Sequence, residues 1–423
     1  MPENTPKLAE LFKQGAKGFT KDLPQALPRP WDAPPQRKED GKDTGDPPAP
    51  YLLDEKDPLA NAAWVALLLR QPLLLTGDPG VGKTRFAEKL AEDLGIGPPT
   101  RVQVKSTTSG RDLLYRFDDL SRFRDATIAG AIARAAGKTD DGEKRNEKKR
   151  DVAEDAKRDA SESEGKPLDE STDAERIRRA QRPLLSYVRM EGLGRAILRA
   201  AGPDFPVKLD QDFDPVEVFG EELAKEKDLT LRHIFRRAFE GEPAARHTVV
   251  LIDELDKAPR DTPNDLLGEI ERMRFRFDEL GFEVEADPQY KPIVVITSNA
   301  ERNLPDAFLR RCVFHHIETP QKEKMCKIAA ARLGGLDPNG ETIQKAWQTA
   351  IDEAWKLFED VRKGITEKQP GTAEFIALVA YLRATDDGKP LSEERIRAAR
   401  RIFNKTKQDL ATADRRPVAS ARP

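Results

Sequence analysis

The residues best suited to chemistry form a glycine-rich stretch, GDPGVGKT, which matches the pattern G-x-x-x-x-G-K-[ST]. Glycines allow backbone N–H groups to close around phosphate oxygens, and the helix that the stretch opens adds positive potential. Lys83 is placed to reach the β- and γ-phosphates of a nucleotide, and Thr84 to ligate Mg²⁺. The predicted phosphate-binding residues are Gly77, Asp78, Pro79, Gly80, Val81, Gly82, Lys83 and Thr84. A chance glycine turn would lack the apolar run before it and the helical pattern after it.

A pair of acids follows a second apolar run, at residues 249–252. Asp253 is the predicted Mg²⁺ ligand, directly or through water, and Glu254 is the predicted group that polarises the attacking water. Such a pair could instead cap the next helix. That helix already has Asp261 or Thr262 as its cap, which favours the catalytic interpretation.

Two more polar positions follow a third apolar run. The sequence IVVITSN ends in Asn299, whose short side chain can orient water against the γ-phosphate. About ten residues later, LPDAFLRR carries Arg310 and Arg311. Alone, each of these signals is weak, and their value comes from their order after the glycine-rich loop and the acid pair.

The elements that must position these residues read as buried strands separated by helices. Short apolar or alternating runs at 72–75, 102–104, 249–252 and 293–296 predict strands, and 313–317 predicts the last one. Helical periodicity covers 59–69, 84–94 and 184–198. This alternation predicts a three-layer α/β domain with a parallel central sheet.

The C-terminal hundred residues carry no strand signal. Amphipathic helices are predicted at 322–333, 341–361, 372–382 and 392–410. Trp347, Ile351, Trp355 and Phe358 form one apolar stripe, which we interpret as core rather than as a binding groove. The chain is therefore divided into an extended Pro-rich tail at 1–50, an α/β domain at 51–317 and a helical domain at 318–423.

A charged insertion interrupts the α/β domain at about 138–182. It is dominated by Lys, Glu, Asp and Arg and has almost no large apolar residue, so we expect it to be mobile or to form a solvated helix with paired charges. Its interleaved acids argue against contact with nucleic acid.

Composition excludes several classes of protein. The hydrophobic fraction is 38%, the charged fraction 35% and the net charge −3, so no global field would attract nucleic acid or acidic lipid. No apolar run approaches the roughly 20 residues that span a bilayer, and the N-terminus has no signal core. Two cysteines make no disulfide framework. We expect a cytoplasmic protein.

The four elements together resemble the AAA+ superfamily and, within it, the MoxR-like ATPases related to dynein and midasin. The resemblance runs from about Tyr51 to Arg311, on PLLLTGDPGVGKT, STTSGRDLLYRFDDLSRFRDA, VVLIDELDKAPRDTPNDLL and IVVITSNAERNLPDAFLRRC, and continues more weakly into the C-terminal helices. It implies that these helices form the lid of a nucleotide site that binds ATP and Mg²⁺.

The resemblance also implies roles for single residues. It makes Asn299 the sensor 1 residue and Arg311 the arginine finger that reaches a neighbour's γ-phosphate, with Arg310 the less favoured candidate. It makes residues 273–287 a hairpin inserted before sensor 1, and the stretch after the second strand an enlarged helix-2 insertion. One departure stands out: PGTAE at 370–374 has no arginine where the family carries sensor 2. Sensor 2 is therefore unassigned, and the candidates to replace it are Lys368 and an arginine elsewhere in the chain.

Three functions are compatible with these features. The first is an ATPase that assembles as a ring, expected to be a hexamer, and remodels a protein partner, for which the resemblance suggests a von Willebrand factor A domain protein. The second is a nucleic-acid motor that uses GTP, as McrB-type proteins do; the third is a slow nucleotide switch in a defence or signalling assembly. A zinc site at Cys312, His315, His316 and Cys326 matches no zinc spacing.

Overall fold

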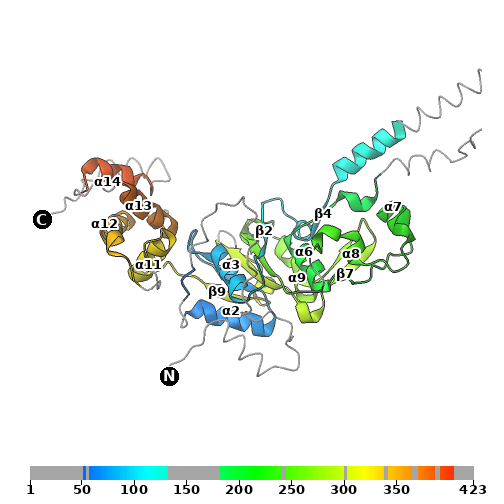
Figure 1. Cartoon of the computed structure of the whole chain (residues 1–423), viewed down its shortest axis with the longest axis horizontal. Helices are drawn as coiled ribbons and strands as arrows, with labels where there is room; N and C mark the ends of the chain where they lie inside the picture. Colours follow the sequence, from blue (N-terminus) through cyan, green and yellow to red (C-terminus); the bar gives the residue numbers. More distant parts are fainter. Residues whose placement is uncertain are drawn as a thin grey trace, which may run out of the picture. The chain divides into compact units, whose positions relative to one another are not determined.

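The computed structural model describes residues 51–53, 57–131, 182–240, 244–299, 303–337, 342–363, 370–385 and 391–403 of the 423-residue chain (Figure 1). The chain forms two compact units. Unit 1 comprises residues 1–109, 247–271 and 291–423, and unit 2 comprises residues 110–246 and 272–290. The predicted Pro-rich tail at 1–50 and the charged insertion, apart from Arg182, lie outside the described residues.

Unit 1 is built on a five-stranded sheet with the strand order β2-β5-β8-β1-β9, in which every neighbouring pair is parallel. The strands are β1 (Leu73–Thr76), β2 (Thr100–Gln103), β5 (Val249–Asp253), β8 (Ile293–Ser298) and β9 (Val313–His316). β1, β5 and β8 are almost wholly buried, which explains why their sequences are continuous apolar runs rather than alternating ones.

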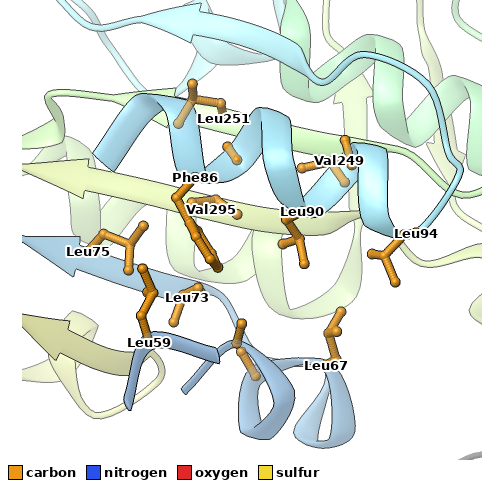
Figure 2. Packing of buried hydrophobic residues seen from close by; sticks show 14 of the residues in the cluster. Leu59, Leu67, Leu73, Leu75, Phe86, Leu90, Leu94, Val249, Leu251 and Val295 are labelled. Carbon is orange, nitrogen blue, oxygen red and sulfur yellow. The ribbon is translucent and has the colours of Figure 1, made fainter. Parts of the chain in front are cut away.

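Helices α2 (Pro58–Leu69) and α3 (Lys83–Asp93) pack on one face of this sheet. Figure 2 shows Phe86 and Leu90 of α3, and Leu94 just after it, in one apolar cluster with alternate strand residues such as Leu73 and Leu75. The intervening strand residues, among them Leu74 and Val250, are also fully buried, so both faces are covered. The predicted three-layer α/β fold with a parallel central sheet and flanking helices is confirmed.

The remaining helices of unit 1 fall into two groups. Near the sheet are α9 (Thr262–Arg272) and the short α10 (Asp306–Leu309). After β9 come α11 (Lys322–Arg332), α12 (Lys345–Arg362), α13 (Thr372–Ala384) and α14 (Glu393–Arg400), gathered around a core of their own (Figure 1).

The apolar stripe of α12 belongs to this helical core, as the sequence indicated. Ile351 and Phe358 are fully buried, and the Phe358 ring meets that of Phe375 edge-on with centroids 5.2 Å apart. Trp347 and Trp355 are partly buried against the same cluster. Helix α14 begins after Ser392, whose hydroxyl accepts a hydrogen bond from Arg395 N, and residues beyond 403 lie outside the described part.

Unit 2 contains two antiparallel strand pairs and several helices. β3 (Tyr115–Phe117) pairs with β4 (Val188–Met190), and β6 (Arg274–Phe277) pairs with β7 (Phe282–Glu285) as a hairpin within the stretch where one was predicted. The helices are α6 (Gly192–Ala201), α7 (Pro215–Phe219) and α8 (Leu231–Ile234), and another helix runs from residue 119 to 131. Short 3₁₀ helices across both units are η1 (Arg111–Leu113), η2 (Leu184–Tyr187), η3 (Leu223–Lys225), η4 (Arg236–Ala238), η5 (Leu255–Lys257) and η6 (Pro288–Tyr290).

The helix predicted at 184–198 is wrong over its first half. Residues 184–187 form a 3₁₀ turn and 188–190 a strand, and the α-helix starts only at Gly192. Pairing with β3 overrides the helical periodicity, because the helix must pass very close to the chain before β3. A Cβ at Gly194 would lie 2.1 Å from the Leu114 carbonyl oxygen. Only glycine allows this approach.

No helix among the described residues is long and apolar enough to cross a bilayer.

A buried histidine beside the sheet should make the stability of the fold depend on pH. The pKa of His247 is lowered from 6.5 to about 4, chiefly by burial and also by the charge of Arg70, against an opposing effect of the Lys291 carbonyl. The unfolded chain then binds more protons between pH 6.5 and 4, so stability falls as pH falls through that window. We expect a loss of about 2 kcal/mol between pH 7 and 5 from this group. Urea unfolding of wild type and His247→Gln at pH 7 and 5 should show that the free energy of unfolding falls less in the variant. An equal fall in the two proteins would show that His247 is not its cause.

Candidate nucleotide-binding and catalytic site

The phosphate loop joins the end of β1 to the start of α3. Its glycines adopt conformations that other residues avoid, with φ of 144° at Gly77, 83° at Gly80 and 100° at Gly82. A Cβ at Gly77 would lie 2.4 Å from the Ile317 carbonyl oxygen, so the start of the loop has no room for a side chain. The predicted pattern thus forms a tight backbone cradle directly at a helix N-terminus, which suits an anionic phosphate.

Lys83 lies across this cradle. Its side chain is buried, and Nζ donates hydrogen bonds to the carbonyl oxygens of Gly77, at 2.6 Å, and Asp78, at 3.0 Å. Burial lowers the pKa of Lys83, and nearby acids, Asp256 first among them, oppose that shift. The acids around it favour a charged ammonium within the loop, where it can meet phosphate oxygens.

Oxygen donors suited to Mg²⁺ meet at the end of β5. Asp253 is buried, and its Oδ1 accepts hydrogen bonds from Thr84 Oγ1, at 3.1 Å, and Thr297 Oγ1, at 2.6 Å. Mg²⁺ is usually held by one or two carboxylates together with substrate phosphates, so a lone carboxylate beside a hydroxyl fits this ion. The described residues contain no group of three or more His, Cys, Asp or Glu arranged to hold a metal.

Glu254 lies at a strained turn immediately after β5. Its backbone is left-handed, with φ 60° and ψ 49°, although it is not a glycine. Its amide donates to Thr297 Oγ1 at 2.9 Å, while its carboxylate accepts from Asn299 Nδ2 at 3.2 Å and Lys257 Nζ at 2.6 Å. Strain of this kind persists where surrounding contacts over-determine the residue and is common at active sites. The predicted water-polarising acid and the predicted sensor are thus in direct contact.

Asp256 has a different position. It is buried, and its Oδ2 accepts a hydrogen bond from the Asn299 backbone amide at 3.2 Å. It therefore anchors the sensor loop, and it does not line the cavity that the other acids face.

These residues surround a cavity of about 1080 Å³ in unit 1, a size typical of small-molecule sites. Its lining includes the loop from Pro79 to Thr84, together with Asp253, Glu254 and Asn299. Other segments complete it: Tyr51 near the described N-terminal end, the end of β9 with the residues after it up to 321, and parts of α11 and α13. Most of the predicted phosphate-binding residues, the predicted metal ligands Thr84 and Asp253, and the predicted catalytic residues Glu254 and Asn299 thus line one cavity.

The place where sensor 2 was sought is the N-terminus of α13. A Cβ at Gly371 would lie 3.1 Å from the Pro79 carbonyl oxygen, so this terminus adjoins the phosphate loop. Thr372 and Ala373 line the cavity there. Helix α11 contributes two cations to the same lining, Lys324 and, at its end, Arg332, and no family motif assigns Arg332. Lys368 lies outside the described residues.

Sequence reasoning missed several residues of the cavity. Tyr51 packs beside Gly82 and edge-on against Phe86, with ring centroids 5.9 Å apart. Arg101, on β2, forms an ion pair with Asp253. Neither carries a motif, and only the alternation of β2 could have suggested that Arg101 faces the site.

Arg311 lies apart from these residues. It follows α10, is about half exposed, and pairs with Glu271 of α9 while Nη1 donates to the Ala307 carbonyl at 3.0 Å. Neither Arg310 nor Arg311 lines the cavity.

The strand–loop–helix, the acids at the end of β5 and the polar residue at the end of β8 form the arrangement of a P-loop nucleotide-binding fold. Residues 72–149 match the family model of the AAA domain of the dynein-related subfamily. A solved structure of C. elegans PCH-2 shares 14% identity over 77% of this chain and 66% of that one, with a TM-score of 0.28. The chain thus spans slightly less than two thirds of that protein. No curated protein matches the sequence.

Proposed function

We propose that this protein is an ATP-hydrolysing, MoxR-like AAA+ motor subunit that works in a hexameric ring and remodels a protein partner. The observation that best supports hydrolysis is the contact between Glu254, on its strained turn, and Asn299. Both residues line the cavity, together with Lys83, Thr84 and Asp253. Binding alone would not require an acid held in this conformation.

The proposed chemistry assigns one task to each group. The loop amides and Lys83 bind the β- and γ-phosphates, exchanging the loop carbonyls that Lys83 now contacts for phosphate oxygens. Thr84 and Asp253 hold Mg²⁺, which when bound neutralises charge that develops on the phosphates. Glu254 accepts a proton from the attacking water. Asn299 orients the Glu254 carboxylate and the water.

Assembly and partner are further parts of the proposal. Arg311 does not line the cavity of its own chain and is about half exposed, which supports a role at a neighbouring subunit's site. The resemblance of the quoted stretches to MoxR-like proteins, together with the dynein-related match, supports a protein substrate. A von Willebrand factor A domain protein is the partner that this resemblance favours, and affinity capture with Glu254→Gln as bait tests it.

Removal of the Lys83 ammonium tests the nucleotide site itself. Lys83→Ala should weaken binding of a fluorescent ATP analogue about a hundredfold, because two charge-assisted hydrogen bonds are lost. Fluorescence titration measures the affinity of wild type and variant for the analogue. Competition with ATP and with GTP in the same assay measures which nucleotide the protein prefers. Lys89→Ala is the matched control, since Lys89 lies on the same helix and pairs with Asp93. Equal affinity in Lys83→Ala and wild type would overturn the phosphate-loop assignment.

A further inference from the structure

Arg101 of β2 is a cation that no motif assigns to the site. β2 is the outermost strand of the sheet on the β5 side, and its residue Gln103 lies beside Asp253 in register. Arg101 and Gln103 share one face of the strand, and both line the cavity. This register brings the Arg101 guanidinium to the Asp253 carboxylate.

Both oxygens of Asp253 are engaged. Oδ1 accepts hydrogen bonds from Thr84 and Thr297, and Oδ2 pairs with Arg101 Nη2. The Asp253 side chain is 6% exposed whereas that of Arg101 is 52% exposed. The Asp253 carboxylate is therefore fixed and buried, whereas the exposed Arg101 guanidinium can change partners without disturbing the core.

Three other cations that line the cavity have partners other than Asp253. Arg85 pairs with Glu88, and Lys324 pairs with Asp57, while Lys83 donates to carbonyls of the phosphate loop. Within the described part of the chain, Arg101 is thus the basic side chain that forms an ion pair with Asp253, the predicted metal ligand.

We propose that Arg101 is an internal counter-ion that reserves Asp253 for a divalent cation arriving with a nucleoside triphosphate. This inference rests on the proposed function. A free divalent ion at Asp253 is repelled by the guanidinium, which already neutralises the carboxylate. A triphosphate brings several negative charges and offers the planar guanidinium a new partner, so the exchange becomes favourable. Arg101 thereby makes metal binding depend on the number of phosphates.

The test is the Mg²⁺ concentration that half-saturates binding of a fluorescent ADP analogue. Arg101→Gln should lower it about three- to tenfold, because one positive charge close to the ion is removed in a half-exposed site. The change should be smaller with the ATP analogue, whose extra phosphate already displaces Arg101. Arg101→Lys keeps the charge and should stay near wild type.

Arg85→Gln is the matched control, since it removes the same charge from the cavity without touching Asp253. An equal shift in Arg85→Gln would assign the effect to overall charge and overturn the proposal. A higher Mg²⁺ requirement in Arg101→Gln would also overturn it, because Arg101 would then orient Asp253 for the metal.

A second measurement needs no nucleotide. Electron paramagnetic resonance of Mn²⁺ should detect tighter binding to Arg101→Gln than to wild type, and Asp253→Asn in the same background should remove the gain. Absence of any gain overturns the role of Arg101. Failure of wild type to bind either nucleotide analogue overturns the proposed function instead, and the two failures are thus distinguishable.

Discussion

Arg311→Ala should bind ATP almost as tightly as wild type and hydrolyse it about 10³-fold or more slowly. Lys83 and a metal leave part of the γ-phosphate charge unneutralised, and a supplied arginine contributes roughly 10³ to 10⁵ in rate. Arg311 does not line its own cavity and is about half exposed beside Glu271, and we therefore propose that it completes the site of a neighbouring subunit. Steady-state phosphate release and fluorescent-ATP titration measure the two quantities.

Mixing Arg311→Ala subunits with Lys83→Ala subunits distinguishes action in trans from a structural effect of the substitution. In mixed rings, an intact Arg311 on a Lys83→Ala subunit completes the site of an Arg311→Ala neighbour, and partial activity should return. Arg310→Ala is the control, because Arg310 is an exposed neighbour with the same charge. If mass photometry shows mixed rings and activity does not return, the assignment in trans is wrong.

Glu254→Gln should retain ATP and Mg²⁺ but lose turnover by about 10²- to 10⁴-fold, since an amide cannot take the proton of the attacking water. Gln keeps the size of Glu and an oxygen that can accept from Asn299. The retained triphosphate should also favour the assembled state. Single-turnover hydrolysis and sedimentation measure both effects.

Asp256→Asn is the informative comparison. Its carboxylate anchors the Asn299 amide from a buried position outside the cavity lining, so its loss should lower thermal stability more than turnover. Wild-type turnover in Glu254→Gln combined with loss of turnover in a folded Asp256→Asn would move the catalytic acid to Asp256.

Local sequence signals predicted the part of the site that lies within single segments. The loop before Lys83 and the acids after β5 were predictable because a strand end, a turn and a helix start leave their own residue patterns. Arg101 was not predictable, because its contact with Asp253 joins positions 152 residues apart and depends on the register of two strands. For the same reason, pairing of β4 with β3 replaced the first half of the helix expected at 184–198.

The lid illustrates the same limit. Absence of an arginine at residues 370–374 was visible in the sequence, but the placement of Arg332 at the cavity was not. It depends on how α11 and α13 pack around Phe375 and its neighbours, which is a matter of tertiary contacts rather than of motif.

The left-handed backbone of Glu254 means that the residue proposed for catalysis is not the residue that would make the folded chain most stable. Glycine or asparagine adopts this conformation at lower cost, by roughly 1 kcal/mol for glycine, so both would make the folded chain harder to unfold. A library selected only for heat resistance should therefore enrich replacements at position 254 and return well-folded proteins without turnover. The acid that we propose for catalysis is therefore one that selection for stability alone would replace.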